Sequence, residues 1–375
     1  MPVKYPDNWA GLNVVLSHDW LTGMRGGEKV LELLCDAFPR APVFTLIYNA
    51  AQISDRIRTH KVTTSWLQHV PGVMKWYRNF LPLFPSAMEG LRAPPADLLI
   101  STSHCVAKGL RPHPGTKHLC YCFTPMRYAW TFYEEYFGRN RLKKAIVSPI
   151  LATLREWDKR TSERVDLFVT LSKHVQHRIQ SFYGRDTEVV YPPVNTEFFT
   201  PAEGGSWDFD LVVSALVPYK RLDLAVRAYT RLGYPLKIVG TGTEYDALRK
   251  LAGPNIEFLG WLSDDQIRDL YRACRCLVFP GEEDFGIVPV EAQACGRPVV
   301  AYGRGGVLES VAENVSGIFF GEQTEGALLG AVEACADTKW DTGAIRRSAE
   351  RFGVQQFVDG LGRCLAKCLG VGVPE

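Results

Sequence analysis

The sequence lacks the features that mark several classes of protein. The opening stretch MPVKYPDNWAGLNVVLSHDW contains no apolar core of the kind that a secretory signal peptide carries. No apolar run approaches the roughly 20 residues that a membrane-spanning helix needs. The formal net charge is only +2, which gives a nucleic-acid partner no electrostatic support. We therefore expect a cytoplasmic protein that binds no nucleic acid.

Cysteine pairs with the spacing of a metal site are also missing. The ten cysteines form no Cys-x-x-Cys pair. The two closest pairs, Cys120 with Cys122 and Cys274 with Cys276, lie inside apolar runs, where residues two apart point to one face of a strand. We interpret the cysteines as small buried apolar side chains in a reducing compartment. Since no His and Cys set has the spacing of a zinc site, we expect no bound metal.

The composition that is present is that of a folded protein larger than one ordinary domain. Of the 375 residues, 46% are hydrophobic and 22% are charged, which is typical of globular chains. From Phe209 to about Asp337, short apolar runs alternate with segments of helical periodicity, and this predicts an α/β fold on a parallel sheet. We expect strands at 210–216, 236–239, 256–259, 276–279, 298–302 and 317–320, and helices at 221–232, 245–251, 263–272, from about 289, and at 308–313.

The N-terminal half repeats this rhythm less regularly. Strands are expected at 13–17, 43–47, 97–101, 118–123 and 167–171, and a helix at 28–38. Two prolines stiffen Tyr191–Val194, and a Pro/Gly-rich stretch follows at 200–206. We therefore divide the chain into an N-terminal domain of residues 1–200, a C-terminal domain of residues 201–350, and a C-terminal helix within 351–375 that packs back across the boundary.

The segment from Glu283 to Glu291 (EDFGIVPVE) carries the strongest chemical signal. A strand ends before it, and Pro289 favours a helix start at that residue, which places Glu291 in the first turn. Free N–H groups at a helix start bind anions, so two carboxylates beside them suit a sugar nucleotide. The spacing equally allows Glu291 to complement the helix dipole and Glu283 to be a solvated loop residue.

The same segment and the following residues 292–301 resemble the E-x7-E region of the retaining glycosyltransferases with a GT-B fold (glycosyltransferase family 4). The resemblance extends over nearly the whole chain. Residues 18–21 and 26–30 are similar to the first strand and the glycine loop of the family. Residues 121–130 and 191–194 are similar to bacterial mannosyltransferases of polysaccharide and O-antigen assembly. The resemblance implies two Rossmann-like domains that face each other across a cleft.

The resemblance also implies roles for individual residues. Glu283 corresponds to the glutamate that contacts the hydroxyl groups of the transferred sugar, and Glu291 to the glutamate that holds the ribose. The other donor-binding candidates are Asp284, Phe285, Gly286, Ile287 and Val288 in the loop whose amides face the sugar and phosphate, and Gly26 and Gly27 in the glycine loop. The nucleotide sugar is a substrate, so no cofactor is implied.

Lys220 resembles the lysine that neutralises the departing diphosphate. Its place just beyond a strand suits this role, because a cation there stabilises developing phosphate charge; an ordinary exposed lysine is the alternative. The family usually carries an arginine on the preceding strand, where this sequence has Ala215. Arg221, next to Lys220, is our candidate substitute. With Lys220 and helix dipoles available, the transfer need not use a metal.

A second departure from the family lies in the N-terminal half. The related pattern reads Tyr-x-His-Thr-Pro, and this sequence has Phe123 in place of the histidine. His104 is a candidate replacement, although a lone histidine is more often structural. Arg127, Tyr128 and Lys108 are further candidates on the acceptor side.

The stretch Trp66–Pro85 combines many aromatic and apolar residues with Lys75 and Arg78, and the run Arg139–Lys144 is basic. Rings and cations together suit a surface that touches anionic lipid. A helix that covers the core and carries solvated lysines fits the same pattern, so both interpretations stay open.

These observations predict a retaining glycosyltransferase that moves a hexose from a nucleotide-diphosphate sugar to a glycan or polyprenyl-linked acceptor. The favoured donor is GDP-mannose, from which mannose would be transferred. The expected location is the cytoplasm, with peripheral attachment to the inner face of a membrane. The donor is expected mainly in the C-terminal domain and the acceptor in the N-terminal domain. The alternatives are a nucleotide-sugar epimerase on the same fold and a sugar-nucleotide-binding protein without transfer activity, which Phe123 and Ala215 would suit.

Overall fold

The computed structural model describes residues 3–131, 141–202 and 208–371. The chain forms two compact units. The C-terminal unit comprises Pro192–Phe357, and the N-terminal unit comprises the chain up to Tyr191 together with the segment from Val358 onward. The sequence predicts a domain boundary after residue 200, whereas the structure divides the chain after Tyr191. The chain passes from one unit to the other twice.

The N-terminal unit is built on a parallel sheet of seven strands in the order β3-β2-β1-β4-β5-β6-β7. Its strands are β1 (Val14–His18), β2 (Val43–Thr45), β3 (Val62–Thr64), β4 (Leu98–Ser103), β5 (Lys117–Cys122), β6 (Leu167–Thr170) and β7 (Thr187–Val189). The five predicted strands are all present. The sequence does not predict β3 and β7, because each is a half-buried edge strand of three residues without an apolar run.

Helices of very different length connect these strands. The longer ones are α1 (Gly26–Ala37), α7 (Arg141–Ser162), α8 (Lys173–Tyr183) and the C-terminal α16 (Val354–Leu369). The short ones are η1 (Asp7–Trp9), η2 (Ala50–Gln52), α2 (Asp55–Arg58), η3 (Trp66–His69), α3 (Val73–Trp76), η4 (Tyr77–Leu83), α4 (Phe84–Glu89), η5 (Ala107–Gly109) and α5 (Arg127–Trp130). The helix expected within 351–375 is α16, whose Lys367 Nζ lies 2.5 Å from Glu188 Oε1 beside β7.

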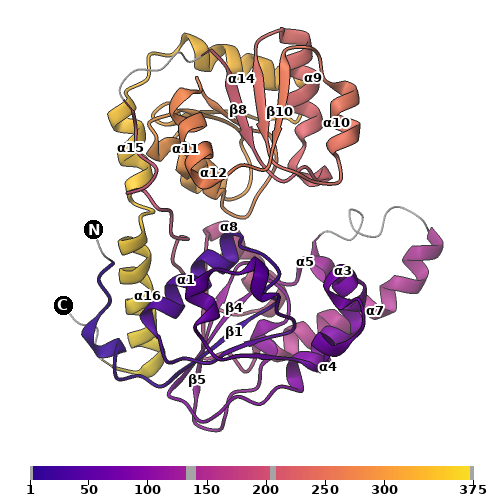
Figure 1. Ribbon diagram of the computed structural model, residues 1–375, viewed down its shortest axis with the longest axis vertical. Coiled ribbons are helices and arrows are strands. Elements are labelled where there is room, and N and C mark those ends of the chain that lie inside the picture. The colour runs from indigo at the N-terminus through magenta and orange to yellow at the C-terminus, as the bar shows by residue number, and fades with distance from the viewer. Residues whose placement is uncertain (1–2, 132–140, 203–207, 372–375) are drawn as a thin grey trace. The chain divides into compact units, whose positions relative to one another are not determined.

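The C-terminal unit is built on a parallel sheet of six strands in the order β10-β9-β8-β11-β12-β13. Its strands are β8 (Asp210–Val213), β9 (Leu236–Val239), β10 (Ile256–Gly260), β11 (Leu277–Phe279), β12 (Val299–Tyr302) and β13 (Gly317–Phe320). Its helices are η6 (Pro218–Lys220), α9 (Leu222–Leu232), α10 (Tyr245–Leu251), α11 (Asp264–Ala273), α12 (Ile287–Ala294), α13 (Val307–Ser310), α14 (Glu325–Asp337) and α15 (Thr342–Glu350). Since α9 contacts α10 and α14 while α12 contacts α11 and α15, two groups of helices cover the two faces (Figure 1).

Local chemistry explains where the observed elements agree with the prediction and where they differ. The capping box at Ser263 is confirmed, because its hydroxyl accepts from Gln266 N–H while the Gln266 side chain bonds back to Ser263 N–H. The strand expected at 210–216 ends at Val213, and a turn follows in which Val217 N–H donates to Ala215 O at 3.0 Å.

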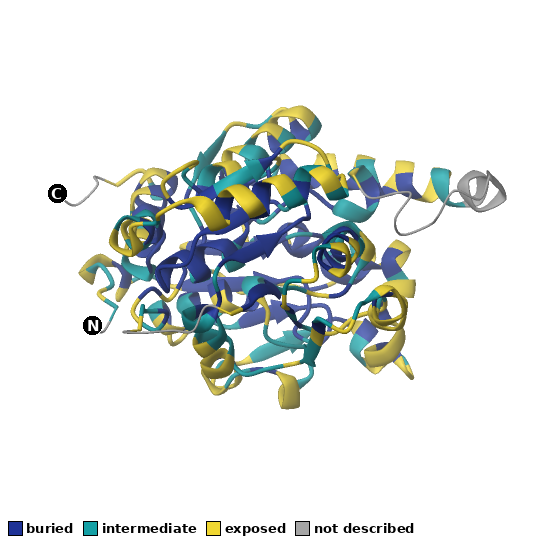
Figure 2. Cartoon of the chain, turned by 90° about the horizontal axis from the view of Figure 1, so that it is seen from above, coloured by how far each residue is buried: buried dark blue, intermediate teal, exposed yellow. Residues whose placement is uncertain are grey.

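Both sheets run through buried cores, and Figure 2 shows dark blue strands with yellow outer faces on the helices. All ten cysteines are buried and unpaired, which confirms their interpretation as packing residues. Each unit is a parallel sheet with helices between successive strands, so the prediction of two Rossmann-like α/β domains is confirmed.

Candidate functional site

Loops at the carboxyl ends of the C-terminal strands bring Lys220 and Glu283 together. Lys220 ends η6 after β8, and Glu283 follows β11, which is the neighbouring strand. Lys220 Nζ forms an ion pair with Glu283 Oε1, and the two side chains are 14% and 24% exposed. The cation and the carboxylate that the resemblance assigns to leaving diphosphate and transferred sugar are therefore partners in this structure.

Three glycines allow the backbones of these loops to approach closely. A Cβ atom at Gly281 would lie 2.9 Å from the Lys220 backbone, and one at Gly305 would lie 2.4 Å from the Glu283 carbonyl oxygen. Gly306 N–H donates to the same Glu283 oxygen at 2.8 Å. The backbone of Glu283 is therefore fixed between the loops that follow β8 and β12.

The helix after this loop begins earlier than the sequence predicts. α12 starts at Ile287, and Gly286 precedes it with a φ of +87°. Pro289 is therefore the third helical residue rather than the first, and Glu291 lies beyond the first turn, which corrects the prediction. Proline is tolerated there because the first four N–H groups of a helix have no intrahelical acceptor. No side chain caps the start of α12, so its backbone suits an anion.

The other residues of this loop differ in how they meet solvent. Asp284, Phe285 and Gly286 are buried, while Ile287 and Val288 are half-buried. The ring of Phe285 packs edge-on against Phe352, with 5.2 Å between the ring centroids. The Phe285 side chain thus faces the interior, and a ligand would meet this residue through its backbone.

Glu291 is held by a tyrosine from the neighbouring helix. The Tyr271 hydroxyl of α11 donates to Glu291 Oε2 at 3.0 Å. Burial, followed by the nearby Glu291 charge, raises the pKa of Tyr271 well above its ordinary value, so the hydroxyl keeps its proton. This bond fixes the Glu291 carboxylate where α11 and α12 pack together.

Arg221 has a left-handed backbone with a φ of +53°, which is uncommon outside glycine. Its Nε lies 3.1 Å from Asp223 Oδ1, and its Nη1 donates to Gln323 Oε1 at 2.9 Å. Gln323 Nε2 in turn donates to the carbonyl of Pro280 at 2.9 Å, at the end of β11. The guanidinium therefore bonds to protein groups that hold the backbone beside Lys220, whereas Ala215 is exposed nearby.

In the N-terminal unit, the residues that follow β1 and β4 form a second polar group. Asp19 is fully buried and accepts backbone N–H groups from the four residues 104–107 at 2.6 to 3.1 Å. His104 Nδ1 lies 2.9 Å from Asp19 Oδ2, and the His104 side chain is 32% exposed. Burial acts to raise the pKa of Asp19, but the charge and hydrogen bonds of His104 hold it well below its ordinary value. Asp19 therefore orients His104.

The glycine loop lies beside this group. Gly26 and Gly27 open α1, and a Cβ atom at Gly27 would meet the Phe123 ring at 3.2 Å and His18 Cε1 at 3.5 Å. His18 Nε2 lies 3.8 Å from Glu28 Oε1. Sequence reasoning did not select His18 or Glu28, although polar residues at the carboxyl end of an apolar strand are a signal of a ligand-binding edge.

Lys108 is buried rather than available to an acceptor, which corrects its place among the acceptor-side candidates. Its Nζ pairs with Asp158, and the two side chains are 2% and 0% exposed. Trp130 Nε1 and the Tyr183 hydroxyl also donate to Asp158, at 2.8 and 2.6 Å. Burial acts to lower the pKa of Lys108, but Asp158 raises it above its ordinary value, so the lysine stays charged. This pair joins η5 to α7, and its role is structural.

Arg127 and Tyr128 are half-buried on α5, the short helix that follows β5. Arg178 of α8 reaches the same loop, with Nη1 3.4 Å from Thr124 Oγ1. These candidates therefore lie at the carboxyl end of β5, and β5 pairs with β4, the strand that precedes His104.

Among the described residues, no group of three or more His, Cys, Asp and Glu side chains could hold a metal ion. The sequence was expected to hold no Asp-x-Asp pair of the kind that binds a divalent ion, but such a pair does occur at residues 208–210. The Asp210 carboxylate is buried, however, and it accepts from Arg275 at 2.9 and 2.5 Å and from Tyr229 at 2.6 Å. Asp210 also begins β8 at the edge opposite Lys220, so it serves the core.

Trp66–Pro85 was interpreted either as a surface that touches lipid or as a helix that covers the core, and each interpretation fits some of its residues. Five of them join the buried core: Leu67, Val73, Tyr77, Leu81 and Phe84. Four large apolar side chains are exposed: Trp66, Met74, Trp76 and Leu83. Lys75 Nζ lies 5.1 Å from the Trp76 ring centroid, and Arg78 Cζ lies 5.3 Å from that of Tyr77. Arg139 lies outside the described residues, as do the side chains of Arg141, Lys143 and Lys144.

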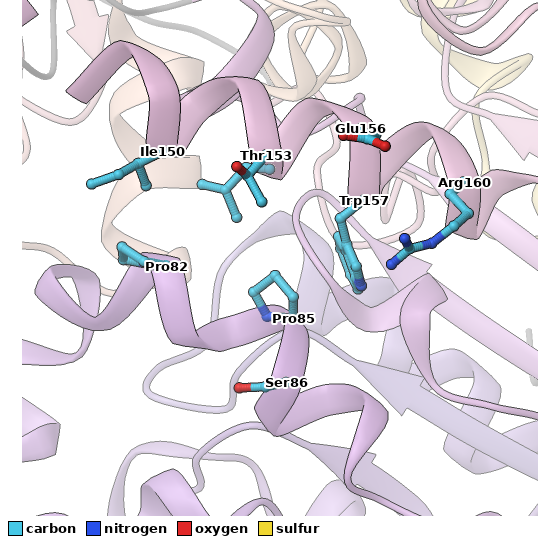
Figure 3. A pocket seen from close by; sticks show the side chains of 9 residues that line it. Pro82, Pro85, Ser86, Ile150, Thr153, Glu156, Trp157 and Arg160 are labelled. Atoms are coloured by element: carbon cyan, nitrogen blue, oxygen red, sulfur yellow. The ribbon is translucent and has the colours of Figure 1, made fainter. Parts of the chain in front are cut away.

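A groove of about 360 Å³ lies between this stretch and α7 (Figure 3). Pro82 and Pro85 face Ile150 across it, and Glu156 and Arg160 lie toward one end. Its lining contains none of the site residues that the sequence predicts. Across the described chain, every helix is too short or too polar to cross a membrane.

Comparison with solved structures defines the class of fold, which is GT-B. Anabaena HepE, solved in complex with UDP and glucose, has a TM-score of 0.69 and 19% identity, over 95% of this chain and 99% of HepE. Sucrose-phosphate synthase from Thermosynechococcus elongatus has a TM-score of 0.73 and 16% identity, over 96% and 99% of the two chains. At such identities the likeness concerns the fold alone.

Comparison of sequences then identifies the related family. Residues 201–342 match the model of the family described as glycosyl transferases group 1. An uncharacterized glycosyltransferase of Methanocaldococcus jannaschii, MJ1178, is 31% identical over 169 residues, which are 44% of this chain and 48% of that protein. Human alpha-1,3/1,6-mannosyltransferase ALG2 is 27% identical over 225 residues, 49% and 53% of the two chains. The chain spans about half the length of these curated relatives. Lys220, Glu283 and Glu291 all lie within the matched residues.

Proposed function

We propose that the protein is a retaining glycosyltransferase that moves a hexose from a nucleotide-diphosphate sugar to a glycan or lipid-linked acceptor without a metal ion. The observation that carries this proposal is the Lys220–Glu283 pair at the carboxyl edge of the C-terminal sheet. The pair lies inside the residues that match group 1 glycosyl transferases. Parallel α/β sheets bind their ligands at this edge.

The paired state suggests how the site receives a donor. Lys220 and Glu283 neutralise each other in this structure. A bound donor would replace that contact with two others, in which Lys220 donates to the diphosphate and Glu283 accepts from sugar hydroxyl groups. As the bond between the anomeric carbon and the diphosphate oxygen breaks, the diphosphate departs with the electron pair, and Lys220 stabilises its growing charge. The acceptor oxygen bonds to the same carbon, and its proton passes to the departing phosphate.

Glu291 and the start of α12 fit the rest of the nucleotide. The helix start offers N–H groups to the phosphates. Glu291, which Tyr271 fixes, is suited to accept the ribose hydroxyl groups. This division of labour separates sugar recognition at Glu283 from nucleotide recognition at Glu291, and substitutions can test the two independently.

The proposal also names a donor and an acceptor. The sequence pattern favours GDP-mannose, and ALG2 is named as a mannosyltransferase, whereas HepE was solved with UDP and glucose. For the acceptor, the exposed rings of Trp66 and Trp76 suit a lipid-linked glycan on an anionic membrane surface. His104, Arg127 and Tyr128 are the residues of the N-terminal unit proposed to meet the acceptor.

A donor panel tests the proposal. The full chain is titrated with GDP, UDP and ADP, and then incubated with GDP-mannose and UDP-glucose in the presence of a chelator. We expect slow release of the nucleoside diphosphate and retained anomeric configuration in the product. Glu291→Ala should weaken nucleotide binding, whereas Glu283→Gln should slow turnover with less effect on binding. Wild-type behaviour of both variants, or activity that needs added magnesium or manganese, would contradict the respective assignment.

A further inference from the structure

Trp261 is the most exposed of the large hydrophobic residues in the described chain. Its relative exposure is 77%. It directly follows β10 and lies two residues before Ser263, the N-cap of α11. It therefore stands at the carboxyl edge of the C-terminal sheet, the same edge that carries Lys220 and Glu283. A solvated indole at this edge is an apolar surface that a flat ring can cover.

Close backbone contacts connect the position of Trp261 to the loop that carries Lys220. Gly240, after β9, donates to the carbonyl oxygen of Gly260 at 2.7 Å. A Cβ atom at Gly240 would lie 1.9 Å from Ser214 O, and one at Gly242 would lie 2.2 Å from Leu216 O. The ends of β10, β9 and β8 thus form one continuous backbone surface. The two glycines allow this close approach, because a side chain at either position would clash with the neighbouring backbone.

The helix after Trp261 also leads to the proposed ribose site. α11 begins at Asp264 and carries Tyr271, whose hydroxyl holds Glu291. The proposed sites for the sugar and the phosphates lie on the other side, after β8 and β11. A nucleotide whose phosphates occupy that side and whose ribose reaches Glu291 can extend its base along α11 toward the end of β10.

We infer that the indole of Trp261 stacks on the nucleobase of the donor. The inference rests on the proposed function, because it takes the site of the phosphates and ribose from it. Stacking on an aromatic ring accepts every base, since each has a π face. Trp261 therefore adds affinity for a nucleotide with any base, and a purine, which overlaps more of the indole, gains more affinity than a pyrimidine does.

Calorimetric titration of the full chain with GDP, UDP and pyrophosphate tests this inference. Trp261→Ala should weaken GDP binding about tenfold or more, which corresponds to about 1.4 kcal/mol per factor of ten, and UDP binding by a smaller factor. Pyrophosphate, which has no base, should bind to this variant as to wild type. Trp261→Phe should keep most of the affinity. Leu251→Ala, which removes an exposed apolar residue at the C-terminal end of α10, is the matched control and should leave the affinity for all three ligands unchanged.

The ligand series separates failure of the inference from failure of the proposed function. If Trp261→Ala binds GDP and UDP as tightly as wild type does, the base does not stack there and the inference is wrong, while the proposed donor site stands. An equal loss of GDP and pyrophosphate binding would also overturn it, because the effect would not depend on the base. If wild type binds neither GDP nor UDP, the proposed function itself fails. A melting curve for each variant confirms the fold, which an exposed side chain is not expected to stabilise.

Discussion

The two units present their charged residues in different ways. In the C-terminal unit, Lys220 and Glu283 come from the loops after two neighbouring strands and meet while still partly exposed. In the N-terminal unit, Asp19 and Lys108 follow β1 and β4 at the corresponding edge, but both are buried and bonded to protein groups. The same topology therefore leaves an ion pair partly open to solvent at this edge in one unit and encloses a polar network in the other.

The difference shows why a charged residue at a sheet edge is not by itself a binding residue. Both Lys220 and Lys108 form an ion pair with a carboxylate. The two lysines differ in solvent exposure, because the Lys220 side chain is 14% exposed and the Lys108 side chain only 2%. A ligand can exchange with the partner of the first lysine, whereas the partner of the second is enclosed by Trp130, Tyr183 and the core.

The largest effect that tests this difference between the two lysines is expected on substitution of Lys108. Lys108→Ala should reduce the free energy of unfolding by about 3–5 kcal/mol, because it leaves Asp158 charged, buried and without its cation. Lys117 is the matched control, since it pairs with Asp166 at 3.0 Å while 50% exposed, and its substitution by alanine should leave the unfolding midpoint close to that of wild type. Urea unfolding measures both. A Lys108→Ala protein of wild-type stability that cannot transfer sugar would restore Lys108 to the acceptor site.

For the Lys220–Glu283 pair of the C-terminal unit, substitution of the lysine should affect activity more than stability. Lys220→Ala should raise the activation free energy of transfer by about 2–4 kcal/mol, because one electrostatic contact to the leaving group is lost. Stability should change little, because the side chain is partly exposed. Comparison of kcat with unfolding midpoints for Lys220→Ala and Lys108→Ala separates a catalytic from a structural lysine. If Lys220→Ala keeps its turnover, the proposed role in departure of the diphosphate is wrong.

Much of the C-terminal unit could be predicted from the sequence, because its signals are local. The six strands alternate with helices at short spacing, and Glu283 to Glu291 form one continuous segment. The N-terminal contacts are not local. Asp19 meets residues 104–107 only after β1 and β4 pair, and Lys108 meets Asp158 across 50 positions. No spacing in the sequence shows whether such residues end up buried together or facing a ligand.

The first residue of α12 and the backbone conformation of Arg221 could not be predicted from the sequence for a different reason. Proline is common at the first position of a helix, so the sequence predicts a helix start at Pro289. In the structure Gly286 adopts a positive φ, and the helix begins two residues earlier, at Ile287. Arg221 occupies a left-handed conformation that favours glycine, and only its bonds to Asp223 and Gln323 explain how it stays there. Residue type alone does not reveal either conformation.

Acid should act on the two units unequally. Burial lowers the pKa of His118 to about 3, so the folded protein keeps it neutral while the unfolded chain takes up a proton below about pH 6.5. Stability is therefore lost progressively as the pH falls from about 6.5 toward 3. The pKa values of Asp19, Glu28 and Glu89 are held low, so stability decreases further below about pH 4.

All four of these groups belong to the N-terminal unit. We therefore expect this unit to open first as the pH falls, which hydrogen exchange followed by mass spectrometry of peptic fragments can resolve. His118→Gln should reduce the loss between pH 6.5 and 4 while leaving the loss below pH 4. If the peptides of residues 208–357 lose protection first, the assignment of acid sensitivity to the N-terminal unit is refuted.

Arg221 offers a smaller and more selective test of the C-terminal site. Arg221→Ala removes the bonds to Asp223 and Gln323 but keeps a β-carbon at a φ of +53°, whereas Arg221→Gly also relieves about 1 kcal/mol of backbone strain. If Arg221 positions Lys220, the glycine variant should be the more stable and the more active of the two. Equal losses of turnover, with GDP affinity reduced alike, would instead indicate a direct contact with the diphosphate.

The smallest effect is expected at the membrane-facing surface proposed for the N-terminal unit. Trp66 and Trp76 are 47% and 54% exposed, and Lys75 lies over the Trp76 ring. Each cation near an anionic surface contributes about 1 kcal/mol, and exposed rings add apolar burial. The sum supports reversible attachment rather than anchoring.

Co-sedimentation with anionic and neutral vesicles at low and high salt measures this attachment. Binding should require anionic lipid and weaken with salt, because the Debye length falls to about 3 Å at molar ionic strength. A variant with Trp66, Trp76, Lys75 and Arg78 changed to serine should bind less without loss of stability, because both rings already face solvent. The matched control changes Trp261 to serine, which removes a more exposed ring on the other unit, and should bind vesicles as wild type does. If wild type ignores anionic vesicles at low salt, the exposed rings do not face lipid, and a soluble glycan becomes the better candidate for the acceptor.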